Sequence, residues 1–157
     1  MEYIKLTIND LPFLNEVRNE CADEYLHDSR TFTLEETIKW FNKTNPDFWV
    51  IWNNDERIGY FRTSNYSNLN RNIYIGADIH QNYRGYGLGY QSYCEFIPIL
   101  FNQLNLHKIS LEVLETNVRA INLYKKVGFI VEGIKRDEIN KNGIWVNSII
   151  MSILEAS

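Results

Sequence analysis

Cysteine, histidine and long apolar runs are scarce in this chain of 157 residues. The two cysteines, Cys21 and Cys94, lie far apart and form no metal or redox motif, so we expect reduced thiols and a cytoplasmic location. The three histidines are isolated, which argues against a histidine-based metal site. No apolar run approaches the roughly 20 residues that span a bilayer, and no signal peptide opens the sequence.

Clusters of basic residues are also missing. The chain carries 16 Lys and Arg against 20 Asp and Glu, a net charge of −4, and no basic run that would bind nucleic acid. Apolar residues, in contrast, make up 45% of the chain and aromatic residues 14%, which is enough for a sizeable core. With no repeat and no linker, residues 1–157 are predicted to form a single domain.

Periodicity predicts an α/β (α+β) fold in which strands outnumber helices. Strands are expected at residues 3–8, 47–52, 57–64, 72–80 and 108–114, followed by two closing strands around the turn "NKNG". Helices are expected after Asn9 or Asp10, from the capping box of Thr33 and Glu36, after the glycines near residue 87, and from Asn117 to Gly128. Pro98 should kink or end the third of these about four helices.

This order fixes much of the sheet topology. The fourth and fifth strands are joined through a helix and should therefore be parallel, whereas most other neighbours should be antiparallel. The sequence thus predicts a mixed, mostly antiparallel sheet flanked by helices.

The stretch "YRGYGLGY" places Gly85, Gly87 and Gly89 where a strand pattern gives way to a helix pattern. A tight turn usually needs only one glycine, so three at alternate positions favour a site for a pyrophosphate. The first N–H groups of a helix have no partner within the helix, and small residues let a phosphate oxygen approach them closely. Arg84 should add a cationic side chain.

The glycine spacing distinguishes between families of phosphate-binding loops. The third glycine comes one place too early for a dinucleotide fold, and no G-K-[ST] ending of a Walker loop is present. The pattern that fits is R-x-x-G-x-G, carried by Arg84, Gly87 and Gly89. At this point the chain resembles the GNAT superfamily of acetyl-CoA-dependent N-acetyltransferases, in which such a loop holds the coenzyme pyrophosphate.

The resemblance covers nearly the whole chain. "LEVLETNVRAINLYKKVGF" resembles the second signature of the superfamily, and the closing segment from Gly128 onward is similar to the branch of ribosomal-protein, polyamine and amino-sugar acetyltransferases. It implies a GNAT fold with the fourth and fifth strands splayed apart. It also implies that acetyl-CoA is bound by Ile79, Arg84, Gly85, Tyr86, Gly87, Leu88, Gly89 and Asn117. Relatives often carry an aspartate at the position of Asn147, so we expect an altered acceptor pocket.

The resemblance also assigns a proton donor. A thiolate leaving group needs an acid or a hydrogen-bond donor, and the superfamily places a tyrosine at the position of Tyr124. Asn117 lies two helical turns earlier, so both side chains should project to one side. The alternative is that Tyr124 is a core aromatic residue with a satisfied hydroxyl.

Glu112 is the candidate general base. Strand alternation sends Leu111 and Val113 to one face and Glu112 to the other, and relatives that acetylate protein N-termini use a glutamate there. A solvated carboxylate is the alternative for Glu112, and Asp78 or a water chain could also take the proton. Backbone N–H groups near Ile79 are expected to stabilise the tetrahedral oxyanion.

The acceptor side gives weaker signals. His27, Asp28 and Arg30 lie in the segment that should wall the acceptor site, where they could read the substrate or simply cap helices. Residues 1–40 hold nine acidic and four basic side chains, which would suit a polyamine unless the acids lie on a solvated helical face.

Together these features predict an acetyl-CoA-dependent N-acetyltransferase that transfers the acetyl group directly to a primary amine, without a metal. The resemblance favours a small acceptor, foremost a nucleotide-linked amino sugar. A polyamine, a protein N-terminus and a non-catalytic acyl-CoA-binding module remain alternatives, and a homodimer stays open.

Overall fold

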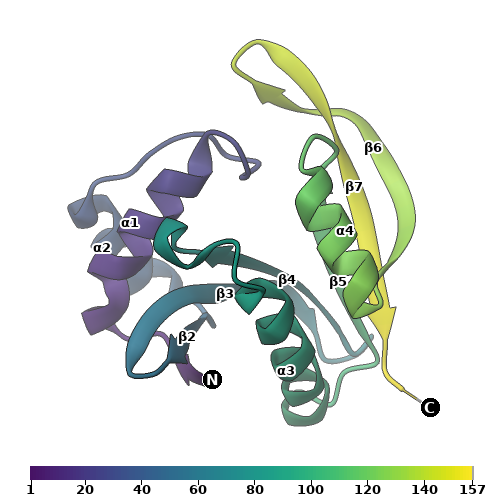
Figure 1. Cartoon of the computed structure of the whole chain (residues 1–157), viewed down its shortest axis with the longest axis horizontal. Coiled ribbons are helices and arrows are strands. Elements are labelled where there is room, and N and C mark those ends of the chain that lie inside the picture. Colours follow the sequence, from purple (N-terminus) through teal and green to yellow (C-terminus); the bar gives the residue numbers. More distant parts are fainter. Residues whose placement is uncertain (157) are drawn as a thin grey trace.

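The alternating strand segments build one seven-stranded mixed sheet, shown in Figure 1 in a computed structural model that describes residues 1–156. The spatial order is β1-β2-β3-β4-β5-β7-β6. All neighbouring pairs are antiparallel except β4 and β5, which are parallel as predicted. The strands are β1 (Glu2–Lys5), β2 (Trp49–Asn53), β3 (Glu56–Ser67), β4 (Asn72–Ile79), β5 (Lys108–Leu114), β6 (Ile130–Lys141) and β7 (Ile144–Leu154).

Four α-helices cover the two faces of this sheet: α1 (Leu11–Ala22), α2 (Leu34–Thr44), α3 (Leu88–Gln103) and α4 (Val118–Val127). Neighbouring strand residues alternate between two cores, because Val50 packs with α1 and α2 whereas Ile51 packs with α3 and α4. No helix within residues 1–156 is long and apolar enough to cross a membrane.

One local prediction was wrong, and one of two alternatives at Pro98 is excluded. The first strand ends at Lys5 rather than residue 8, because the Asp10 carboxylate accepts the Thr7 N–H at 2.8 Å and starts a short 3₁₀ helix at Ile8. Pro98 does not end α3, which continues to Gln103. Burial of Phe96 and Leu100 on either side of the proline outweighs the lost backbone hydrogen bond.

The parallel pair β4 and β5 separates along its length, as the sequence predicted. Their register joins residues 72–74 only to residues 108–110. Beyond Tyr74, β4 continues to Ile79 without pairing to β5, while β5 continues to Leu114 beside β7. This opening of the sheet, with the long β6–β7 hairpin rising beside α4 (Figure 1), positions the candidate site.

Candidate active site

The glycines at 85–89 serve two different purposes. Gly85 and Gly87 have φ angles of 87° and 76°, a left-handed backbone that strongly favours glycine. Gly87 is the N-cap of α3, so the loop turns directly into the helix. Gly89 instead permits close packing, because a Cβ there would lie 3.4 Å from the Leu123 side chain of α4. The cluster therefore shapes a turn and brings α4 close to the start of α3.

A cleft of about 210 Å³ lies beside this loop, and we call it the glycine cleft. It lies at the N-terminus of α3, where unpaired N–H groups and the helix dipole favour an anion. Tyr86 is 75% exposed and does not line the cleft, so its contact with the coenzyme stays a prediction. Residues that do line it include Ile79, Arg84, Gly85, Gly87, Leu88, Gly89, Asn117, Arg119, Ala120 and Tyr124.

Arg84 lines this cleft, but its side chain is also bonded to neighbouring segments. Its Nε donates to the Ile79 carbonyl at 2.9 Å, and its Nη2 donates to the Cys21 sulfur at 3.1 Å. These bonds satisfy a carbonyl at the end of β4 and tie the loop to α1. Arg119, in the first turn of α4, reaches to about 4.0 Å from where a Gly85 Cβ would stand. Sequence reasoning missed Arg119, although it comes two positions after the expected helix cap.

A second cavity of about 400 Å³, the His27 pocket, joins the glycine cleft at α4. Its lining includes His27, Asp28, Arg62, Asp78 and Glu112, and it shares Asn117 and Tyr124 with the cleft. The Tyr124 ring meets the Tyr93 ring edge to face, with centroids 5.3 Å apart. Burial raises the pKa of Tyr124 above its ordinary value, so its hydroxyl keeps its proton at neutral pH.

Asp78 and Glu112 are two of the three carboxylates that line the His27 pocket, and each contacts a cation. Asp78 is buried, and its Oδ2 lies 3.2 Å from the Arg62 Nε. Glu112 is partly exposed between buried Leu111 and Val113, and its Oε1 lies 2.7 Å from the Lys135 Nζ of β6. The Glu112 carboxylate raises the pKa of Lys135. Glu112 thus faces a cavity rather than open solvent. The sequence did not suggest that Lys135 would be its partner.

The segment between α1 and α2 is tied across this pocket to the β6–β7 hairpin. His27 Nε2 shares a hydrogen bond of 2.8 Å with the Ser148 hydroxyl of β7. Lys141 at the end of β6 donates to the carbonyls of Ala22 and Leu26 at 2.9 and 2.7 Å. Burial lowers the pKa of His27, which favours the neutral imidazole. No local pattern could have indicated Ser148 or Lys141, because their partners lie more than 110 residues away.

Asp28 and Arg30 form an ion pair beside the His27 pocket. Arg30 binds the Asp28 carboxylate through Nε at 3.0 Å and Nη2 at 2.7 Å, which lowers the pKa of Asp28 to about 2. Asp28 lines both the His27 pocket and a neighbouring cavity, whereas Arg30 lines only the neighbouring cavity. Asn147 lies outside both, because its side chain accepts the Asp137 N–H at 2.8 Å in the β6–β7 hairpin. The expected effect of Asn147 on the acceptor pocket stays a prediction.

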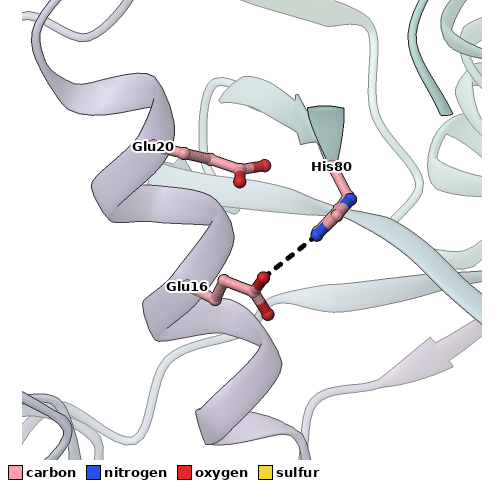
Figure 2. A group of neighbouring side chains, drawn as sticks. All are labelled: Glu16, Glu20 and His80. Atoms are coloured by element: carbon pink, nitrogen blue, oxygen red, sulfur yellow. Dashed lines mark hydrogen bonds and ion pairs between the residues drawn. The ribbon is translucent and has the colours of Figure 1, made fainter. Parts of the chain in front are cut away.

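Glu16, Glu20 and His80 form the one group in residues 1–156 with the spacing of a metal site (Figure 2). Its hydrogen bonds suit a structural support instead. The Asn82 N–H donates to His80 Nδ1 at 3.1 Å, which leaves the ring proton on Nε2, 3.2 Å from the Glu16 carboxylate. A metal at Nε2 would need the proton on Nδ1, facing another donor. Glu20 accepts the Gln81 N–H at 2.9 Å, so the group holds the segment before the glycine loop.

This mixed sheet with its four helices has the fold of a solved N-acetyltransferase. The chain belongs to the acetyltransferase (GNAT) family, which residues 13–129 match.

Among its relatives, the spermidine N(1)-acetyltransferase of Escherichia coli K12 is 31% identical over 106 residues, which cover 68% of this chain. The [ribosomal protein uS5]-alanine N-acetyltransferase of the same strain is 26% identical over 74% of the chain. These alignments span 57% and 62% of the two relatives.

Solved structures match over a greater length. The spermidine N-acetyltransferase of Vibrio cholerae, in complex with CoA and spermine, superposes with a TM-score of 0.90 at 24% identity. The match covers 98% of this chain and 94% of that protein. This likeness establishes the fold.

Proposed function

We propose that the protein is an acetyl-CoA-dependent N-acetyltransferase that transfers the acetyl group directly to a small primary amine. One observation carries the proposal. Tyr124 lies on the wall shared by a cleft suited to an anion and a pocket lined by carboxylates. Two substrates bound in these cavities would meet at the Tyr124 hydroxyl, which is the arrangement that direct transfer through a ternary complex requires.

The glycine cleft would hold the coenzyme. Loop N–H groups and the start of α3 would receive the pyrophosphate, with Arg119 and Arg84 as the cationic side chains of the lining. Acetyl-CoA supplies the acetyl thioester. Backbone N–H groups near Ile79 would stabilise the oxyanion, although the His80 N–H is excluded because it donates to the Ile58 carbonyl at 2.8 Å.

The proton transfers fall to residues of this chain. As the amine nitrogen bonds to the acetyl carbon, Glu112 takes one proton from it, directly or through water. Tyr124 then gives its proton to the sulfur as the carbon–sulfur bond breaks. Asp78 is the rival base, but both of its oxygens lie within 3.4 Å of the Arg62 guanidinium.

The acceptor we favour is the amino group of a nucleotide-linked amino sugar. The three carboxylates that line the His27 pocket all contact cations of the protein, so a polycationic acceptor would have to displace those partners. A polyamine is the second candidate, favoured by the named activity of the spermidine N-acetyltransferase relatives. A protein N-terminus, named for the ribosomal-protein relative, is the third.

Release of CoA from acetyl-CoA, measured with a panel of amines, tests the proposal. Amino-sugar nucleotides should support release, and spermidine and an alanine-initiated peptide should support less. Release only with spermidine or only with the peptide would identify that alternative as the substrate. No release with any amine, together with tight acetyl-CoA binding, would identify a non-catalytic binding module. A cytoplasmic location and a homodimer stay predictions.

A further inference from the structure

A cavity of about 570 Å³ lies between α1, α2 and the sheet, next to the His27 pocket. We call it the Phe32 cavity. Its aromatic lining consists of Phe32, Trp40, Phe48 and Tyr60. Phe48 and Tyr60 are nearly parallel at 8°, with centroids 6.2 Å apart, and Trp40 lies 5.4 Å from Phe48. Tyr60 is only 1% exposed, so the partly buried Phe32, Trp40 and Phe48 are the rings that can offer an apolar face to a planar ligand.

Phe32 is held in place by side chains of α1. Asn19 receives the Phe32 N–H on its Oδ1 at 2.9 Å and donates to the Phe32 carbonyl at 2.7 Å. Asn15 donates to the same carbonyl at 2.8 Å. The guanidinium of Arg18 lies 4.6 Å from the centre of the Phe32 ring. The backbone is therefore fixed independently of the ring, which is the condition for a preorganised contact.

The charged residues of the cavity are mostly basic. Four cations, Arg18, Arg30, Lys39 and Arg62, face two acids, Asp28 and Glu36. Both acids are engaged, because Asp28 binds Arg30 and Glu36 accepts the Thr33 N–H at 3.1 Å. Three of the cations are engaged as well, since Arg18 and Arg30 contact Asp28 and Arg62 contacts Asp78. Lys39, in contrast, makes only an exposed pair with Glu35 at 3.7 Å, which a phosphate can replace at little cost. An anion suits this lining better than a polyamine.

The Phe32 cavity and the His27 pocket adjoin each other. They share Arg18, Asp28, Phe48 and Arg62, so one acceptor can extend from the Tyr124 hydroxyl into the aromatic lining. The two volumes, about 400 and 570 Å³, are together large enough for a nucleotide-linked sugar.

We infer that the Phe32 cavity is a subsite for the nucleoside diphosphate part of the acceptor. This rests on the proposed function: the amino sugar occupies the His27 pocket, the base stacks within the aromatic lining, and the diphosphate lies near Lys39 and Arg30. Phe32 and Lys39 are then specificity-determining residues that never touch the reacting amine.

Titration of UDP and of GDP into the full-length protein, saturated with CoA, tests this subsite without requiring turnover. Saturation with CoA keeps the nucleotide out of the glycine cleft. Phe32→Leu should weaken nucleotide binding about tenfold or more, as loss of one stacked aromatic does. Tyr66→Leu, which changes an exposed aromatic residue of β3 outside the cavity, should leave it unchanged.

The charge contribution is tested separately on α2. Lys39→Gln should weaken nucleotide binding several-fold, and the difference from wild type should shrink as salt rises. Lys43→Gln, four residues along the same helix and outside the cavity lining, is the matched control. Both positions are exposed, so folding should be retained even if Phe32→Leu proves unstable.

The subsite would be overturned if neither UDP nor GDP bound the CoA-saturated protein at millimolar concentration. Binding that neither Phe32→Leu nor Lys39→Gln weakens would place the nucleotide elsewhere and overturn it too. Spermine binding that Phe32→Leu weakens would assign the cavity to a polyamine instead. Absence of acetyl transfer to any amine would contradict the proposed function. The titration measures binding alone, so it would still show whether the Phe32 cavity holds a nucleotide.

Discussion

The glycine cleft and the His27 pocket differ in how the chain builds them. The cleft is made largely from two short segments, the loop at residues 84–89 and the start of α4, and its shape depends on backbone geometry. The pocket is made of side chains from β3, β4, β5 and the segment before α2, and ties to the β6–β7 hairpin hold that segment over it.

This difference predicts how each region responds to mutation. A binding site formed by the backbone loses affinity when a new side chain fills it or strains its turn. In a pocket lined by ion pairs, removal of one charged partner instead changes the charge that a ligand meets. Variants in the cleft should therefore act on coenzyme binding, and variants in the pocket should act on the acceptor and on pH dependence. Tyr124, which belongs to both, should affect turnover alone.

The largest effect is expected for Tyr124→Phe. Removal of the hydroxyl should lower kcat by roughly 10²–10⁴, the usual contribution of a positioned acid, while ring packing against Tyr93 is retained. Steady-state kinetics with the true acceptor measure this, and calorimetry should show unchanged acetyl-CoA affinity. Tyr90→Phe, which removes another hydroxyl from the glycine cleft, is the control. Wild-type kcat in Tyr124→Phe would assign the residue to packing.

The next largest effect should come from Gly87→Val. A Val side chain would occupy space that a phosphate needs and would strain a backbone with a φ of 76°. Acetyl-CoA affinity measured by calorimetry should fall tenfold or more, equivalent to about 1.4 kcal/mol. Gly133→Val, where a Cβ meets no atom within 4 Å, controls for the substitution itself. Unchanged affinity in folded Gly87→Val would contradict the cleft assignment.

Glu112→Gln tests the pocket through its pH profile. If Glu112 accepts the amine proton, kcat/KM should lose its base-dependent rise with pH while acetyl-CoA affinity is kept. Glu132→Gln breaks a comparable Glu–Lys pair, with Lys108, outside the pocket and should leave the profile unchanged. An amine acceptor titrates as well, so both variants are compared with wild type on one acceptor. Identical profiles and rates for Glu112→Gln and wild type would leave Asp78 or water as the base.

The smallest effect concerns His27 and stability. Its pKa is lower in the folded protein than in the unfolded chain, mainly through burial, so the unfolded state binds the proton more readily. The free energy of unfolding should therefore decrease as the pH falls below about 6.5, the pKa of an unfolded histidine. Chemical denaturation at pH 7.5 and 5.5 measures this decrease, and the free energy of unfolding of His27→Gln should fall less between the two pH values than that of wild type. His107→Gln, at an exposed position, should retain it.

The sequence predicted the glycine cleft better than the pocket, for a physical reason. Gly85, Gly87, Asn117 and Tyr124 lie in two contiguous motifs whose geometry follows from local backbone rules. Arg84 belongs to the same motif, yet its side chain bonds to Cys21 of α1, which no local rule could indicate. The sequence also could not decide whether Pro98 ends its helix, because core burial decided the length of α3.

In the pocket, the individual residues were predictable but their partners were not. Alternation in β5 correctly separated Glu112 from buried Leu111 and Val113. Its partner Lys135 comes from another strand, brought near by the register of the β6–β7 hairpin. His27 was expected in a wall segment, but its bond to Ser148 depends on the completed sheet. Long-range ion pairs and hydrogen bonds thus define what the pocket can accept.

The meeting of two substrates at Tyr124 is tested most directly by initial-rate kinetics of CoA release, with acetyl-CoA and the acceptor varied together. Direct transfer predicts intersecting lines in double-reciprocal plots, and intact-protein mass spectrometry should show no acetylated protein after incubation with acetyl-CoA alone. Parallel lines together with an acetylated protein would show a covalent intermediate, and would contradict an account in which both substrates occupy their cavities at once.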